Sequence, residues 1–94
     1  MATETLKLRL YVTGLTPVSR RLAERLHRLF ETELQHDYHL EVRDILEQPQ
    51  AAMDDDILVT PTLLRLRPPP PRRLIGDLSR RERVLDGLCL QAGG

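Results

Sequence analysis

The chain has 94 residues, of which 40% are hydrophobic and 30% are charged, and its formal net charge at pH 7 is zero. A chain of this length forms one small domain, here residues 1–94. The zero net charge argues against nucleic acid as a partner, and no stretch approaches the roughly 18 apolar residues of a membrane span. The N-terminus also lacks a signal-peptide pattern, which predicts a cytoplasmic protein.

The first half of the sequence predicts a strand, a long helix and a second strand. Apolar and polar residues alternate over 6–12, which is typical of a strand with one buried face. Thr16 is a favourable N-cap and Pro17 suits the first helical position, so a helix is predicted from Pro17 to about Gln35. A second alternating segment around Leu40 predicts a strand that ends near Ile45.

The second half predicts shorter elements. A short helix is expected from Pro49 to about Asp56, and the apolar segment 62–66 predicts a strand. Four prolines, 68–71, indicate a stiff connection to a further strand at 72–75; a docking ligand for an aromatic-lined groove is the alternative. Ser79 with Glu82 three residues later is a capping-box pattern, which predicts a last helix through about Leu90.

The predicted order βαβαββα is that of an α/β, thioredoxin-like fold. In oxidoreductases of this fold, reactive cysteines lie at the N-terminus of the first helix, where the helix dipole lowers the pKa of a thiol. The corresponding loop, 13–17, holds no cysteine. Pro61 resembles the proline, usually cis, that precedes the third strand of such folds. Cys89 is far from that loop in sequence and is interpreted as a small buried hydrophobic residue, with a thiol-dependent oxidoreductase as the less favoured function.

No residue pattern indicates another catalytic, cofactor-binding or metal-binding site. His27, His36 and His39 fall on a helix, a turn and a strand start, which is not a metal-ligand spacing. The three carboxylates of 54–56 follow one another, so on a helix they point in different directions, and a solvated helix end is the preferred interpretation.

Four segments carry a resemblance to the KaiB family of bacterial clock proteins. They read LRLYVTGLTPVS at 8–19, DILEQPQ at 44–50, ILVTPTL at 57–63 and PPPPRRLIGDLS at 68–79. The last is the most specific, and the similarity extends over about residues 6–90.

The resemblance implies a non-enzymatic regulatory protein that binds a KaiC-like ATPase and modulates its phosphorylation state. It also implies partners of the KaiA, SasA and CikA types. Members of the family are metamorphic, so a second fold, ordered βαββααβ and packed as a tetramer, is the alternative to the thioredoxin-like monomer. A KaiB-like paralogue that serves a stress or signalling system is the alternative function.

The resemblance also suggests where a partner binds. The family usually has lysine where this chain has Glu41 and Glu47, and an aliphatic residue where it has Arg43. We expect the partner surface to follow the second strand and the segment after it; a merely solvated edge strand is the alternative. The residues predicted for this surface are His39, Glu41, Arg43, Asp44, Glu47, Gln48 and Pro49.

Overall fold

A computed structural model of the chain describes residues 5–34 and 37–90. Seven elements follow one another in the order βαβαββα, which confirms the predicted thioredoxin-like fold. They are β1 (Leu6–Val12), α1 (Pro17–Glu33), β2 (Tyr38–Asp44), α2 (Pro49–Asp54), β3 (Thr62–Arg67), β4 (Arg72–Ile75) and α3 (Arg81–Gly87).

The four strands form one mixed sheet in the order β2-β1-β3-β4. β1 pairs with β2 in parallel, with Leu6 opposite Tyr38 and Val12 opposite Asp44. β1 pairs with β3 antiparallel, and β3 pairs with β4 antiparallel. β2 and β4 therefore form the two edges of the sheet, and the C-terminal ends of β1 and β2 lie at the same end as the start of β3.

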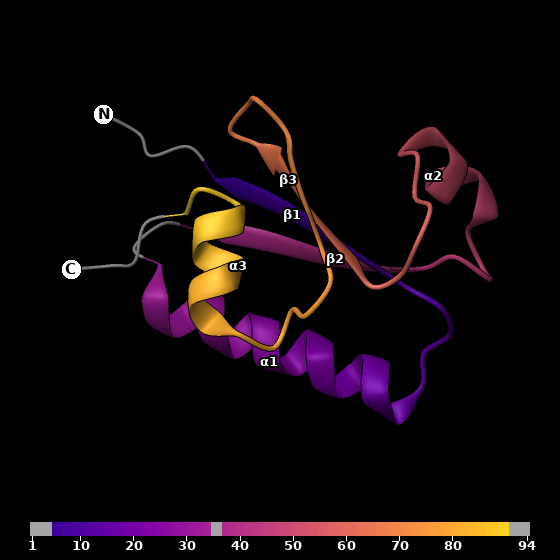
Figure 1. Cartoon of the computed structure of the whole chain (residues 1–94), viewed down its shortest axis with the longest axis horizontal. Helices are drawn as coiled ribbons and strands as arrows, with labels where there is room; N and C mark the ends of the chain where they lie inside the picture. The colour runs from indigo at the N-terminus through magenta and orange to yellow at the C-terminus, as the bar shows by residue number, and fades with distance from the viewer. Residues whose placement is uncertain (1–4, 35–36, 91–94) are drawn as a thin grey trace.

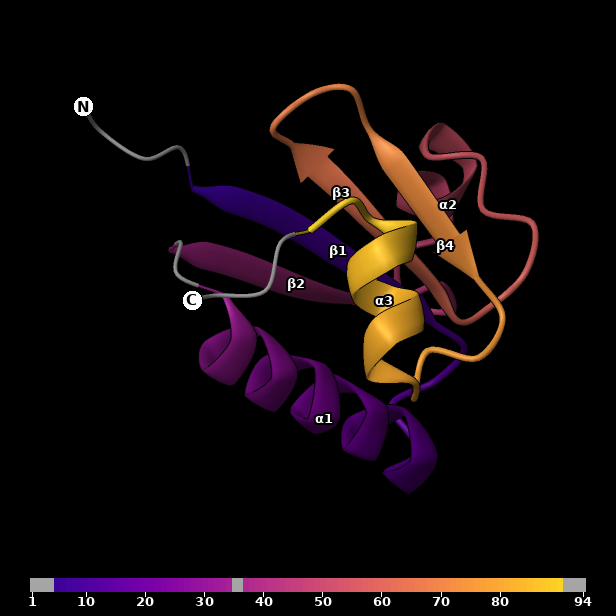
Figure 2. The ribbon, with the colours of Figure 1, turned by 60° about the vertical axis from the view of Figure 1, so that its left-hand side comes forward.

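Helices α1 and α3 cover one face of the sheet, and α2 lies on the other face near one end (Figures 1 and 2). The alternation of β1 explains the first layer, because its even-numbered residues point to α1 and α3, where they join the main core. The fully buried side chains of this main core include Leu8, Leu10, Leu26, Phe30, Leu63, Val84 and Leu88. On the opposite face, Tyr11 and Leu64 pack against Ala52 of α2 in a smaller cluster.

Helix α1 begins as the sequence predicts. The Thr16 hydroxyl accepts a hydrogen bond from the backbone N–H of Ser19 at 3.2 Å, and Pro17 occupies the first turn. The helix ends at Glu33, and Leu34 caps it with its N–H on the carbonyl of Phe30. The predicted end at Gln35 lies outside the described residues, as does His36.

The start of α3 differs from the prediction. Its N-cap is Arg80, and its side chain makes no capping hydrogen bond. Ser79 fails as a cap because Asp77 engages it: both the N–H and the hydroxyl of Ser79 donate to Asp77 Oδ1. The capping box with Glu82 is therefore wrong: the N-cap is one residue later than predicted, and α3 begins at Arg81.

The end of α3 also differs, since the helix stops at Gly87 rather than near Leu90. Cys89 is exposed and has φ of +54°, so its interpretation as a buried hydrophobic residue is wrong. Its N–H donates to the carbonyl of Asp86, and the N–H of Leu90 donates to the carbonyl of Leu85 at 2.7 Å. These two bonds form a Schellman motif, in which the left-handed position favours glycine.

We expect Cys89→Gly to raise the free energy of unfolding by about 1 kcal/mol, because glycine adopts a positive φ without the steric cost paid by other residues. Urea unfolding followed by circular dichroism measures the change. Cys89→Ala is the matched control: it also removes the thiol but keeps the Cβ, so its stability should equal that of the parent. An equal gain in both variants would contradict the conformational explanation.

The prolines at 68–71 connect β3 to β4, as predicted. The peptide bonds Arg67–Pro68 and Pro69–Pro70 are cis, and so is Thr60–Pro61, immediately before β3. Arg65, on β3, is buried beneath this connection and the end of α3. Its guanidinium donates to the carbonyl oxygens of Pro70 and Leu88, each at 2.9 Å, so it joins the proline connection to α3.

Candidate partner-binding surface

The predicted partner surface begins on β2, which pairs only with β1 in the described part of the chain. His39, Glu41 and Arg43 alternate with core residues and therefore lie on the face of the sheet that carries α2. His39 is exposed, whereas Glu41 and Arg43 are half-buried. The structure brings these three side chains together on one face at one edge of the sheet.

Glu41 and Arg43 belong to a network of ion pairs on that face. Arg9 of β1 contacts Glu41 at 3.0 Å and Asp55 at 2.8 Å. Arg43 contacts the second oxygen of Glu41 and the side-chain oxygen of Gln48, both at 3.1 Å. The charges of β2 are thus held in place by neighbouring strands and by the segment after β2.

Asp55 joins this network from the end of α2. It accepts hydrogen bonds from Arg9 and from the Tyr11 hydroxyl, which also lies 3.0 Å from the carbonyl oxygen of Ala51. The interpretation of 54–56 as a merely solvated helix end is therefore wrong for Asp55. Sequence reasoning missed Arg9 and Asp55 because they are 46 positions apart and lie on different elements.

The network shifts the pKa values of its members. Burial acts to raise the pKa of Glu41, but hydrogen bonds from Arg9 and Arg43 outweigh it and hold the pKa below its usual value. Burial also acts to raise the pKa of Asp55. Hydrogen bonds from Tyr11 and Arg9 outweigh this effect and lower the pKa. Burial first, and then the hydrogen bond to Asp55, raise the pKa of Tyr11 to about 12. Both carboxylates are therefore ionised at neutral pH.

Asp44 has a different place from the other predicted residues, because it is buried. Its Oδ1 accepts hydrogen bonds from the backbone N–H of Gly14 at 2.8 Å and of Leu46 at 2.9 Å. It thereby ties the β1–α1 loop to the β2–α2 loop. Asp44 supports the surface rather than presenting itself to a partner, whereas Glu47, Gln48 and Pro49 are exposed beside it.

A third loop joins these two at the same end of the sheet. The hydroxyls of Thr13 and Thr60 lie 2.6 Å apart, which links the β1–α1 loop to the α2–β3 loop. Six exposed hydrophobic side chains lie at this end of the sheet, on the three loops, on the first turn of α1 and on α2. We call these six side chains the apolar end. They are Leu15 (54% exposed), Val18 (70%), Leu46 (66%), Met53 (70%), Leu58 (91%) and Val59 (48%).

Sequence reasoning did not find the apolar end. Its residues lie outside the regular alternation of the strands, and only the meeting of three loops shows that they share one end of the sheet. An exposed apolar surface with a charged border is typical of an interaction site. Leu46 is followed in sequence by the exposed Glu47, Gln48 and Pro49, so the predicted β2 surface adjoins the apolar end at the β2–α2 loop.

The positions used for redox chemistry in thioredoxin-like enzymes hold threonine and proline here. The β1–α1 loop contains Thr13 and leads into Pro17, the first residue of α1, and it meets the cis peptide at Thr60–Pro61. The thiol of Cys89 is not part of this arrangement. Cys89 follows α3, and its carbonyl oxygen lies 3.4 Å from Arg65, which is in the second half of β3. Pro61 immediately precedes the first residue of β3, so Cys89 and Pro61 lie beside different parts of that strand.

Three further observations concern the described residues. Within 5–34 and 37–90, no three His, Cys, Asp or Glu side chains gather as they would around a metal ion. His27 contacts the Tyr38 hydroxyl at 3.0 Å and so joins α1 to β2. No helix in these ranges is both long and apolar enough to cross a membrane.

The fold and the loop without cysteine define a thioredoxin-like domain with an apolar surface where such enzymes carry their thiols. Comparison with known proteins identifies the family: the KaiB domain matches residues 9–90, and the chain belongs to the KaiB family. The resemblance found in the sequence is thereby confirmed.

The relatives are clock proteins. A circadian clock oscillator protein KaiB from Prochlorococcus marinus (strain MIT 9211) is 55% identical over 87 residues, covering 93% of this chain and 76% of that protein. One from Synechococcus sp. (strain RCC307) is also 55% identical and is covered to 79%. Membership of this family makes the chain a circadian clock protein.

The fold has a solved neighbour in a second clock protein. The N-terminal domain of SasA from Synechococcus elongatus superposes with a TM-score of 0.76 and 26% sequence identity. The match covers 99% of this chain and 91% of that domain. The structure described here therefore has the thioredoxin-like arrangement of the SasA domain.

Proposed function

We propose that this protein is a non-enzymatic regulatory protein of a cytoplasmic clock system that docks on a KaiC-like ATPase and modulates its phosphorylation state. The apolar end carries this proposal. Six hydrophobic side chains remain exposed there, four of them on loops that Asp44 and the Thr13–Thr60 contact hold together. Burial of such a surface against a partner is favourable because apolar area leaves water.

The charged side chains beside the apolar end support the same proposal. Glu47 is exposed next to Leu46, and the Glu41–Arg43 pair lies along β2. Charges at the border of an interface influence the rate of encounter and the choice of partner more than the final affinity. We assign the apolar end to binding energy and the β2 charges to partner selection.

The likeness to SasA supports a second part of the proposal. Two domains of the same fold compete when they use the same surface on one partner, so we propose that this protein and a SasA-type domain exclude each other on a KaiC-like ATPase. KaiA-type and CikA-type proteins are the further partners that we propose. We also propose that the chain exchanges with the βαββααβ fold and self-associates to a tetramer in that state, as the family resemblance implies.

A KaiB-like role in a stress or signalling system is the second candidate function. The altered charge pattern of β2 favours it, since Glu41 stands where lysine is usual in the family and is held by ion pairs with Arg9 and Arg43. Charges at the edge of an interface influence which partner is recognised. Binding to the ATPase of one system and not the other decides between the two candidates.

We expect Leu58→Glu to weaken binding to the KaiC-like ATPase at least about tenfold, because it places a charge in the most exposed part of the apolar end. Biolayer interferometry with the ATPase immobilised measures the affinity. Thr32→Glu is the matched control: it adds the same charge at an exposed position in the last turn of α1, at the opposite end of the sheet from the apolar end. Equal losses in both variants, or none in Leu58→Glu, would contradict the proposed surface.

Glu47→Lys tests the charged border of the apolar end. We expect this variant to change the rate of association with the KaiC-like ATPase.

A further inference from the structure

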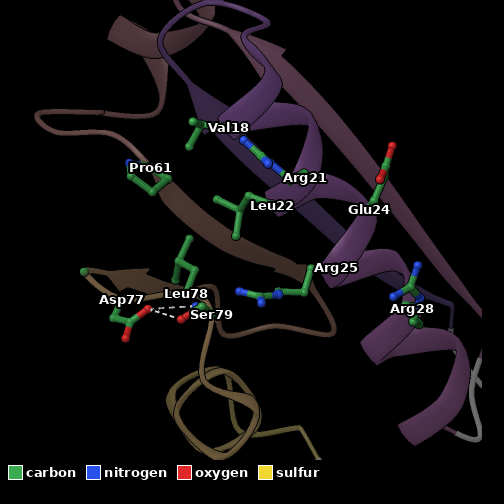
Figure 3. A pocket seen from close by; sticks show the side chains of 11 residues that line it. Val18, Arg21, Leu22, Glu24, Arg25, Arg28, Pro61, Asp77, Leu78 and Ser79 are labelled. Carbon is green, nitrogen blue, oxygen red and sulfur yellow. Dashed lines mark hydrogen bonds between the residues drawn. The ribbon is translucent and has the colours of Figure 1, made fainter.

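A groove of about 610 Å³ lies between α1 and the segment that joins β4 to α3 (Figure 3). Leu22 and Leu78 contribute to its floor, and Pro61 and Val18 close one end. Except for Val18, these residues do not belong to the apolar end. The groove is on the α1 and α3 side of the sheet, so it is opposite the face that carries Glu41 and Arg43.

Three arginines of α1 line this groove. Arg21, Arg25 and Arg28 recur at helical spacing, so they form one stripe along the helix, and all three are exposed. Arg25 extends across the groove toward Leu78 and Ser79 (Figure 3). None of the three makes an ion pair with any carboxylate of residues 5–34 and 37–90.

The two carboxylates at the groove do not neutralise the arginines. Glu24 points away from it (Figure 3). Asp77 is ionised, but its carboxylate accepts hydrogen bonds from the hydroxyl and the N–H of Ser79 and forms no ion pair with the α1 arginines in the described part of the chain. Arg80 and Arg83, beyond the groove, supply further positive charge near Asp77. The positive charge along α1 is therefore available to a ligand.

The spacing of the arginines suggests the shape of that ligand. A helix rises by 1.5 Å per residue, so the backbones of Arg21 and Arg25 are separated by about 6 Å along α1. In an extended chain, every second side chain points the same way at intervals of about 6.6 Å. Carboxylates at alternate positions of an extended segment thus match the arginine stripe, while its other side chains face the Leu78 side of the groove.

We propose that this groove binds an extended acidic segment of a partner protein, with alternate Asp or Glu residues on the α1 arginines and apolar residues between them. The apolar floor favours a peptide over nucleic acid, since no aromatic side chain is available there for base stacking. This site adjoins the proposed ATPase-binding surface and shares Val18 with it.

The test uses a fluorescein-labelled peptide in which Glu and Leu alternate, titrated with the full chain and followed by fluorescence anisotropy. We expect Arg25→Glu to weaken binding at least about tenfold, because it replaces an attraction by a repulsion at the centre of the groove. Arg67→Glu changes the net charge equally but lies at the end of β3, and we expect a change within about twofold. Higher salt weakens binding to the parent protein.

Three outcomes would overturn the proposal. The first is equal binding of a peptide with Gln in place of Glu. The second is binding of single-stranded DNA with the same dependence on Arg25, which would indicate a nucleic-acid site. The third is self-association that Arg25→Glu abolishes, which would assign the groove to a second copy of this chain. Circular dichroism checks that the variants fold, and the milder Arg25→Gln replaces Arg25→Glu if the latter does not.

Discussion

We expect Arg65→Met to lower the free energy of unfolding by about 2 kcal/mol, one of the two largest effects predicted for this protein. The Arg65 guanidinium is buried and donates to the carbonyl oxygens of Leu88 and Pro70. Methionine fills similar space but leaves both oxygens without this donor. Because these oxygens belong to the end of α3 and the proline connection, we also expect faster amide exchange in α3 than in α1.

The burial of Arg65 also has a cost, which makes this experiment informative. No acidic side chain pairs with Arg65, and its Nε has no hydrogen-bond partner among the described residues. Arg65→Lys keeps the charge but donates to fewer carbonyls, so we expect an intermediate loss. Arg67→Met, on the exposed end of β3, serves as the matched control and should leave stability unchanged. A gain in Arg65→Met would mean that desolvation outweighs the hydrogen bonds.

The second large effect is expected for Asp55→Asn, which should lower the free energy of unfolding at pH 7 by about 2 kcal/mol. The substitution removes the charge that Arg9 contacts at 2.8 Å and weakens the hydrogen bond from Tyr11. Asp54→Asn is the control, since Asp54 is exposed and its only side-chain hydrogen bond within the described ranges is with Gln50. Urea unfolding at several pH values measures both.

The pH dependence of this loss has a definite sign. The pKa of Asp55 is lower in the folded protein than its ordinary value of 3.8. The contribution of Asp55 to the free energy of unfolding is therefore fully present above pH 3.8, and it is lost as the pH falls from 3.8 toward the pKa of the folded state. The stability gap between the parent and Asp55→Asn should therefore close in acid. Loss of the Asp55 charge should also lower the pKa of Tyr11 from about 12, which absorbance titration reports. A gap that widens in acid would contradict this account.

The elements that sequence reasoning predicted correctly are those set by local chemistry. The alternation of β1 places every second side chain on one face, and no later contact can change that period. The N-terminus of α1 needs only Thr16, Pro17 and the N–H of Ser19, all within four residues. The family motifs are local strings too, so the thioredoxin-like order followed from neighbouring residues.

The features that were missed depend on residues far apart in sequence or on competition between partners. Ser79 was expected to cap α3, but Asp77 is two residues away and accepts both of its hydrogen bonds. Arg65 was interpreted as part of a strand, and nothing in the sequence indicated that its partners would be carbonyls of Pro70 and Leu88. The apolar end depends on three loops meeting, which alternation cannot predict.

The contacts that hold these three loops together also affect how a complex forms. Asp44 and the Thr13–Thr60 contact fix the loop backbones before a partner arrives, so little conformational entropy is left to lose on binding. For molecules in the fold described here, we therefore expect the rate of association to depend on collision and orientation rather than on loop rearrangement. The lifetime of the complex then depends on how completely the partner removes Leu58 and its neighbours from water.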